Sequence, residues 1–392
     1  MKPSLEVADI FRAYGAVYRQ AHEMPLRHLR AMRAIKICRT AELGGHVEEC
    51  DHCGQLRISY NSCRNRHCPK CQGLDKERWL EARKRNILPT HYFHLVFTLP
   101  EGLRPLCLRN QKVAYSILFG SGSESLKQLS EDPKHLGAEV GFIAVLHTWT
   151  QTLMDHPHLH CIVTGGGLSL EGKRWVQCRR KFFIPVKVLS RMFRGKFLAY
   201  LQEAYEKGKL VFPGKIAHLE EKSAFKGLLR ELYKQEWVVY CKPPFRSAER
   251  VMEYLGRYTH RVAISNDRLV KMEGGRVTFR YRDRGDNDRV RLMTLDADEF
   301  IRRFLLHILP DGFVKIRHYG ILSNRNRKAK LGLCKRLLGV DCRIEGSEKK
   351  IESWQELLTR ITGVDPRICP SCGKGKMLLK NILNPSAPPL AP

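Results

Sequence analysis

The stretch His156-Pro-His-Leu-His-Cys-Ile-Val163 is the part of the sequence that decides the fold and the chemistry. Alternate residues of a β-strand point to the same face, so His158 and His160 can present their imidazoles to one ion while Leu159 turns into the core. The simpler alternative is a row of histidines on an ordinary exposed strand. We interpret the segment as a strand that carries two metal ligands.

A pair of imidazoles leaves a catalytic metal site incomplete, because such an ion needs a third protein ligand and open positions for substrate. Gln151 is the candidate, since a short turn would bring its amide oxygen beside the histidines, and Asp155 and His156 are rivals. A mixed nitrogen and oxygen set suits Mg²⁺ or Mn²⁺ acting as a Lewis acid on a phosphate. Tetrahedral zinc would be the structural alternative.

A second motif places two tyrosines four residues apart in Tyr254-Leu-Gly-Arg-Tyr258-Thr-His-Arg261. Residues i and i+4 of a helix lie on one face, so both hydroxyls can reach the same site. An apolar stripe buried in the core is the alternative interpretation. The neighbouring cations favour chemistry, because they stabilise a phenolate and a phosphate; they are Arg257, His260 and Arg261.

The surrounding pattern predicts an α+β fold in which an antiparallel sheet carries the histidines and is covered by helices. Strands are predicted at 91–99, 140–149 and 157–164, with three glycines at 165–167 ending the last, and short strands at 262–264 and 268–272. A hairpin is predicted at 277–282 and 289–295. Helices are predicted within 5–37, at 74–86, at 248–259 with Ser247 as N-cap, and at 297–308, with a hairpin and basic helices in 168–240.

The sequence contains 14 cysteines, many of them in Cys-x-x-Cys pairs. Such clustering in a cytosolic chain indicates zinc and not disulfides. One structural Zn²⁺ is predicted on two pairs with zinc-ribbon spacing, namely Cys50, Cys53, Cys68 and Cys71. A second site is possible on the interleaved Cys38, His46, Cys63 and His67, although Cys63 and His67 could also enter the first. Cys369-Pro-Ser-Cys372-Gly is half a site, which Cys334 and Cys342 could complete.

The 69 lysines and arginines exceed the 40 acids and give a net charge of +29. A polyanion is the expected partner, and nucleic acid should bind with strongly salt-dependent affinity. Loop residues of the cysteine-rich module are expected to contact DNA, namely Arg64, Asn65, Arg66 and Lys70. No apolar run approaches a membrane span, and residues 1–12 lack a signal core, so we expect a cytoplasmic protein without a membrane partner.

These motifs in this order, after the strand His94-Leu-Val-Phe-Thr-Leu99, resemble the HUH endonucleases, in which two histidines flank one hydrophobic residue. More closely, the chain resembles the two-tyrosine rolling-circle transposases of the insertion-sequence ninety-one family. The segments that carry this resemblance are 146–151, 156–163, 254–265 and 317–325, and it covers roughly residues 38 to 330. It implies an antiparallel-sheet HUH core preceded by a zinc-ribbon-like module.

The resemblance also implies residue roles. Tyr254 and Tyr258 would be nucleophiles that form 5′-phosphotyrosine links, and His158, His160 and Gln151 would hold the catalytic metal. The chain would be a metal-dependent endonuclease and strand transferase that acts on single-stranded element ends and target DNA. We expect a bacterial protein that is associated with the nucleoid when bound to DNA.

Three domains are predicted: basic helices and the zinc-binding domain at 1–88, the two-tyrosine catalytic domain at 89–330, and a basic C-terminal extension with a mobile tail at 331–392. Two alternative functions remain open at this point. A rolling-circle replication initiator would use the same histidines and tyrosines, and a non-catalytic zinc-ribbon nucleic-acid-binding protein would use only the charge and the cysteines. The sequence does not predict the oligomeric state.

Overall fold

The computed structural model describes residues 5–84, 86–178, 184–245, 250–251, 253–254, 256, 262–283, 285–340 and 353–386. Several predictions made from sequence lie outside this set. They concern Ser247, Arg257, Tyr258, His260, Arg261 and Cys342, and the tail from residue 387 onward.

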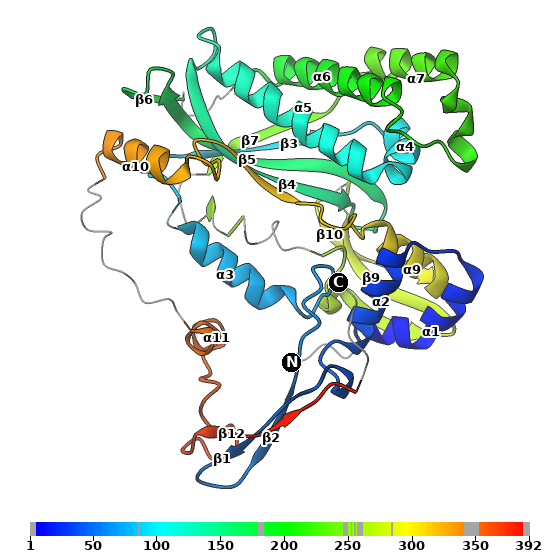
Figure 1. Ribbon diagram of the computed structural model, residues 1–392, viewed down its shortest axis with the longest axis vertical. Coiled ribbons are helices and arrows are strands. Elements are labelled where there is room, and N and C mark those ends of the chain that lie inside the picture. The colour runs from blue at the N-terminus through cyan, green and yellow to red at the C-terminus, as the bar shows by residue number, and fades with distance from the viewer. Residues whose placement is uncertain are drawn as a thin grey trace.

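The main sheet is antiparallel and has the strand order β11-β4-β5-β3-β7. Short β6 pairs with the far end of β5, which is the long central strand in Figure 1. The strands are β3 (Tyr92–Thr98), β4 (Ala138–Trp149), β5 (Asp155–Ser169), β6 (Trp175–Gln177), β7 (Val239–Phe245) and β11 (Ile316–Gly320). The predicted antiparallel α+β fold is confirmed.

The two faces of this sheet differ because side chains alternate along each strand. One face supplies Phe97, Leu159 and Phe142 to the largest apolar core. Helices cover this face, as Figure 1 shows; they are α4 (Arg104–Arg109), α5 (Gln111–Glu131), α6 (Val186–Glu206) and α7 (Lys222–Lys234). The other face carries His158 and His160.

Strand β5 continues through the three glycines that were predicted to end it. Each glycine lies where the backbone of a neighbouring segment approaches closely. A Cβ on Gly166 would lie 2.6 Å from the carbonyl oxygen of Val176, and one on Gly167 would lie 2.5 Å from that of Glu139. Here glycine permits close strand packing, so the predicted strand end was wrong.

A second sheet, of order β10-β9-β8, shares a core with the N-terminal helices. Phe11 packs edge-on against Phe304 at a ring distance of 5.4 Å. The elements are α1 (Val7–Ala21), α2 (Leu26–Ile37), β8 (Leu269–Glu273), β9 (Arg276–Asp283), β10 (Arg289–Asp296) and α9 (Ala297–Leu306). The predicted strand at 262–264 is instead a bend, because Ala263 and Ile264 are used to pack this core.

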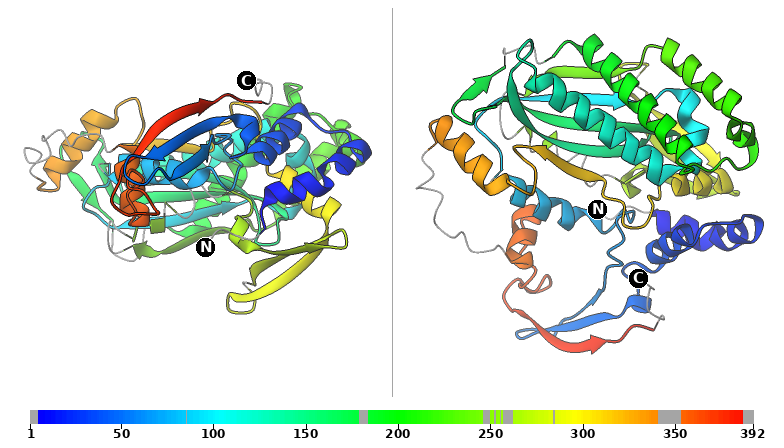
Figure 2. Two further views of the ribbon diagram at one scale, coloured as in Figure 1. Left: turned by 90° about the horizontal axis from the view of Figure 1, so that it is seen from below. Right: turned by 45° about the horizontal axis from the view of Figure 1, so that its top comes forward.

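A third sheet, of order β12-β1-β2, lies at the edge of the molecule, away from the main sheet (Figure 2). It joins β1 (Gly45–Cys50) and β2 (Leu56–Tyr60) to β12 (Met377–Leu383) from the far end of the chain. The remaining helices are α3 (Gln72–Lys84), α10 (Arg327–Leu337) and α11 (Trp354–Thr362), with short 3-10 turns at 41–43, 101–103, 214–220 and 266–268.

Candidate catalytic centre and metal sites

Three imidazoles meet on the face of the main sheet opposite α5 and α6. His158 and His160 come from β5 and His147 from β4, and one ring nitrogen from each lies within 4.8 Å of the others. His147 is the direct cross-strand partner of His158. His147 was not predicted from the sequence, although pairing the two predicted strands across their short connection would have brought it opposite the histidine motif.

Gln151 lies in the turn between β4 and β5, and its backbone carbonyl accepts a hydrogen bond from the Arg268 guanidinium. Asp155, one rival ligand, is buried; desolvation raises the pKa of its carboxyl to about 7, and Arg104 partly opposes this. The ring of His156, the other rival, lies 5.3 Å from that of His158. His147 therefore adds a third nitrogen to the predicted pair, and ligation by Gln151 stays a prediction.

Hydrogen bonding orients the two predicted histidine ligands. Nδ1 of His158 lies 2.6 Å from the carbonyl oxygen of His156 and donates to it, which leaves the lone pair of Nε2 for an ion. Nδ1 of His160 lies 2.9 Å from Nε2 of His94 on neighbouring β3. Ligating histidines are commonly held through their second nitrogen in this way.

Tyr254 lies beside this centre, within a helical stretch that includes residues 250–251 and 253–254. Its hydroxyl is 2.5 Å from Nε2 of His94 and 3.2 Å from Nδ1 of His160. Burial lowers the pKa of His94 to about 3, with Lys242 and His158 adding to this, so His94 is neutral near pH 7. The structure thus brings Tyr254 to the histidines, as the sequence predicted.

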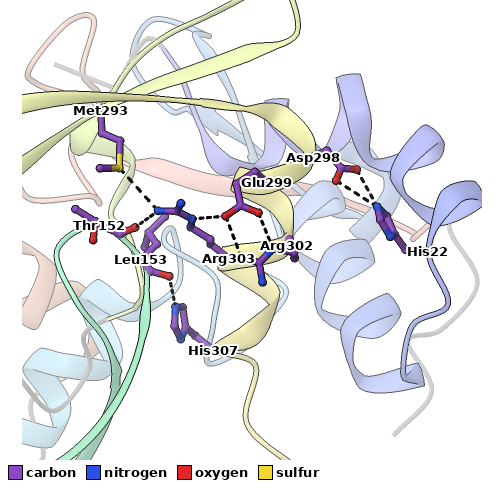
Figure 3. A network of polar contacts seen from close by, with 9 residues as sticks. All are labelled: His22, Thr152, Leu153, Met293, Asp298, Glu299, Arg302, Arg303 and His307. Carbon is purple, nitrogen blue, oxygen red and sulfur yellow. Dashed lines mark hydrogen bonds and ion pairs between the residues drawn. The ribbon is translucent and has the colours of Figure 1, made fainter. Parts of the chain in front are cut away.

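Helix α9 and its C-cap residue His307 hold the turn between the two histidine strands through backbone carbonyls (Figure 3). Arg303 donates to the carbonyl of Thr152 at 3.0 Å, and His307 donates to that of Leu153 at 3.0 Å. Glu299 accepts from Arg303 at 2.6 Å. Hydrogen bonds from Arg302, which has the largest effect, and from Arg303 lower the pKa of Glu299 to about 2. The Glu299 carboxylate is therefore charged and fixes the Arg303 guanidinium.

The cysteines form two clusters, in a grouping that corrects the predicted one. The first cluster is Cys38, Cys63, Cys68 and Cys71, and the second is Cys50, Cys53, Cys369 and Cys372. The predicted single site on Cys50, Cys53, Cys68 and Cys71 was wrong. The first pair lies at the tip of the β1–β2 hairpin, and the second pair follows its base. At about 3.3 Å per residue, its strands carry Cys50 and Cys53 roughly 17 Å from the hairpin base.

Both clusters have the dimensions of a tetrahedral zinc site. In the first, the sulfur of Cys71 lies 3.5 Å from that of Cys38 and 3.6 Å from that of Cys63. Zinc–sulfur bonds of about 2.3 Å imply sulfur–sulfur distances of about 3.8 Å in a tetrahedron, whereas a disulfide would need about 2.0 Å. All eight clustered cysteines are free thiols, so they fit zinc.

The other predicted zinc ligands lie elsewhere. His46 faces Glu48 at 3.7 Å. The buried Nε2 of His67 accepts from the backbone N–H of Leu309 at 3.4 Å, and burial holds the pKa of His67 well below its usual value. A second site on Cys38, His46, Cys63 and His67 was therefore wrong, because its two thiols complete the first cluster. Cys334 is buried on α10 and does not complete the pair of Cys369 and Cys372.

Two of the loop cations expected on DNA are engaged within the protein. Arg66 donates to the carbonyl oxygens of Pro310 and Phe313. Lys70 forms an ion pair with Glu6 at 2.5 Å. These contacts attach the cysteine-rich loop to its neighbours, and a role of this loop in binding DNA stays a prediction.

Comparison with known proteins places this centre in context. Residues 141–330 match a family model described as "Putative transposase", and residues 10–99 match one described as "Transposase zinc-binding domain". "Putative transposase y4qJ" of Sinorhizobium fredii (strain NBRC 101917 / NGR234) is 50% identical over 380 residues, which cover 97% of this chain and 96% of that protein. "Transposase for insertion sequence element IS801" of Pseudomonas savastanoi pv. phaseolicola is 28% identical over 322 residues, which cover 81% of this chain and 76% of that protein. No solved structure matches the chain significantly.

These matches define the class of protein as a transposase, and therefore as an enzyme that processes DNA. The chain belongs to the IS91 family of transposases and has its zinc-binding domain at the N-terminus. The first cysteine cluster lies inside that domain and supports a structural Zn²⁺. Among the described helices, none has the length and apolar character needed to cross a membrane.

Proposed function

We propose that this transposase nicks and rejoins single-stranded DNA through 5′-phosphotyrosine intermediates on Tyr254 and Tyr258, during rolling-circle transposition of an insertion sequence. One observation carries the proposal. The Tyr254 hydroxyl lies 3.2 Å from Nδ1 of His160, and His160 belongs to a three-histidine cluster of metal-binding dimensions. A protein that only binds DNA has no need to bring a tyrosine hydroxyl to such a cluster.

His147, His158 and His160 would hold a divalent cation, which supplies Lewis-acid polarisation of the scissile phosphate when bound. Three imidazole nitrogens favour Mn²⁺ over Mg²⁺, because Mg²⁺ prefers oxygen ligands. Gln151 remains a candidate for an additional oxygen ligand, since it lies in the turn that joins β4 to β5. Three protein ligands leave positions open for phosphate and water.

The chain's own residues would position the nucleophile. A tyrosine oxygen gives up its proton and attacks phosphorus, the bond from phosphorus to the 3′ oxygen breaks, and the departing 3′ oxygen takes up a proton to become a 3′-hydroxyl. The reverse reaction with a new 3′-hydroxyl rejoins DNA and releases tyrosine. Tyrosine is a weak nucleophile at its usual pKa near ~10, so the neighbouring cations matter. We choose Tyr258, which His260 and Arg261 follow in the sequence, for the first nick, and Tyr254, whose hydroxyl contacts His94, for later transfer.

A small, largely apolar cavity on the histidine face of the sheet has two arginines in its lining, which would suit a DNA backbone passing beside it. Arg83, Arg327 and His318 line it together with apolar residues, among them Val251 from the Tyr254 helix. Burial, followed by the charges of Arg83 and Arg327, lowers the pKa of His318 to about 4, so the imidazole is neutral. Burial and then repulsion from Arg327 also lower the pKa of Arg83. A phosphate of a bound strand would relieve this repulsion. We expect the protein to act on the nucleoid of a bacterial cell.

The test is formation of a covalent adduct with labelled single-stranded DNA from the element ends, in the presence of Mn²⁺. Tyr258→Phe should abolish the first adduct, whereas Tyr254→Phe should retain the nick and impair later transfer. Tyr233→Phe is the matched control, because Tyr233 is exposed on α7, and should behave as wild type. An adduct that persists in the Tyr254→Phe, Tyr258→Phe double variant would overturn the proposal, since another residue would then be the nucleophile.

A further inference from the structure

We propose that the second cysteine cluster is a structural zinc site built from the two ends of the chain, and that this zinc clasps the C-terminal strand to the N-terminal hairpin. Cys50 and Cys53 lie inside the matched zinc-binding domain, which spans residues 10–99. Cys369 and Cys372 lie beyond both matched regions, the second of which ends at residue 330. The matched domain therefore contains only half of this site.

The two halves are copies of one local structure. Each is a Cys-x-x-Cys-Gly turn in which the glycine N–H donates to the carbonyl of the first cysteine. The donor–acceptor distance is 3.1 Å for Gly54 to Cys50 and 3.0 Å for Gly373 to Cys369. The glycines have matching φ angles of 68° and 66°, in the left-handed region that glycine adopts without strain. Two such turns facing each other are the usual architecture of a four-cysteine zinc ribbon.

The sulfur atoms pair across the two turns. The Cys50 and Cys372 sulfurs are 3.7 Å apart, as are those of Cys53 and Cys369. These distances match the tetrahedral edge of about 3.8 Å expected for zinc and thiolate ligands. The backbone N–H of His52 donates to the Cys50 sulfur, and that of Gly375 donates to the Cys372 sulfur, each at 3.4 Å. Such N–H donors stabilise ligating thiolates.

The backbones of the two turns also interlock. Lys376 N–H donates to the Asp51 carboxylate at 2.8 Å, and Asp51 N–H donates to the Lys376 carbonyl at 3.1 Å. Gly375 lies so close to the N-terminal turn that a Cβ there would be 2.6 Å from the Cβ of His52. The site therefore forms only when the two ends of the chain meet.

Backbone pairing with β1 and a Lys380–Glu49 ion pair hold β12, but the surrounding sheet has little apolar core to support it. Its local apolar core consists of Cys50, Cys369 and Met377, with Cys372 packed against it. On β12, Leu378, Leu379 and Ile382 are 54%, 63% and 73% exposed. A sheet of three short strands with so small a core is marginal in water, and a bound metal supplies the missing folding energy. Zinc at this cluster is what would keep β12 paired with β1.

Metal analysis of the purified full-length protein, prepared without chelator, tests the proposal. Wild type should contain two zinc ions per chain, and the Cys369→Ser, Cys372→Ser double variant should contain one. Cys241→Ser is the matched control, because Cys241 is a partly exposed cysteine on β7 outside both clusters, and should retain two. Limited proteolysis should release the segment after α11 from the double variant and not from wild type.

Gly375→Ala separates loss of zinc from loss of a ligand. It leaves all four thiols in the chain but places a methyl group 2.4 Å from the Cys50 sulfur and 2.6 Å from the His52 Cβ, so the two turns cannot close on one ion. It should also contain one zinc and expose β12 to protease. Covalent adduct formation with DNA reports that the rest of the chain is folded in each variant. Two zinc ions in the Cys369→Ser, Cys372→Ser double variant would overturn the proposal. So would a wild-type protein that contains a single zinc, if Cys63→Ser loses that zinc and the double variant keeps it.

Discussion

The histidine centre and the cysteine clusters are held in place by different forces. The histidines sit on adjacent strands in register, and the same strands bury Phe142 and Leu159 on the opposite face. The cysteines sit on turns and short strands, and the second cluster has almost no apolar core. The sheet would therefore keep its histidines in place without an ion, whereas the cysteine turns depend on one. Metal loss should remove activity at the first site and folded structure at the others.

The largest effect is expected at the histidine centre. The His158→Ala, His160→Ala double variant should lower covalent adduct formation by about 10³-fold or more, because polarisation of the phosphate by the ion contributes several kcal/mol. Its melting temperature should stay close to that of wild type, since the sheet core is untouched. Salt-sensitive DNA binding should also persist. Unfolding of this variant would show that the ion has a structural role at the histidines as well.

The first cysteine cluster should respond in the opposite way. Cys63→Ser removes one ligand, so the protein should lose one zinc and the segment around Cys38 and Cys71 should become open to protease. Activity should fall only as far as the folded fraction falls. Metal content, proteolysis and adduct formation per folded molecule are the measurements, with Cys241→Ser as control. Unchanged zinc content would contradict the tetrahedral assignment.

A smaller loss of activity is expected when the histidine ligands are kept but the turn that positions them is loosened. Arg303→Met removes the donor to the Thr152 carbonyl and loosens the turn between the ligand-bearing strands. Changes to groups that orient metal ligands typically cost about 10- to 100-fold in activity or metal affinity. Adduct formation should fall within that range and recover partly at high Mn²⁺. Arg302→Met is the control, because Arg302 hydrogen-bonds Glu299 and should have a weaker effect. Equal losses in both variants would contradict positioning by Arg303.

The sequence predicted the strands and helices well because their apolar periodicity is local information. Strands β3 and β4, the β9–β10 hairpin and α9 all follow from alternation or helical spacing along short windows. The family resemblance, carried by the two-histidine and two-tyrosine motifs, was confirmed by the matched regions. Both depend on residues close together in the chain.

The errors concern partners that are far apart. The third imidazole, His147, becomes apparent only when the two predicted strands are paired in register, because it belongs to the strand opposite the histidine motif. The cysteine grouping depends on whether residues 54–67 fold as one loop or extend as a hairpin, because only the hairpin separates the two pairs. The sequence nonetheless contained a pattern that indicates the second cluster. The same Cys-x-x-Cys-Gly motif occurs at Cys50–Gly54 near one end of the chain and at Cys369–Gly373 near the other.

The smallest expected effect concerns Gln151, whose backbone carbonyl is held by Arg268 in the turn before β5. With His147 as the third nitrogen ligand, an oxygen from Gln151 would only supplement the set, so Gln151→Ala should reduce adduct formation by a few-fold at most. His147→Ala should cost about 100-fold, because it leaves two ligands, too few to hold an ion firmly against water. The informative measurement is the Mn²⁺ concentration that gives half-maximal adduct formation. It should rise strongly for His147→Ala and hardly at all for Gln151→Ala. If the two variants behave in the opposite order, the amide is the third ligand and His147 serves only to pack against Trp149, with which it already stacks at 4.9 Å.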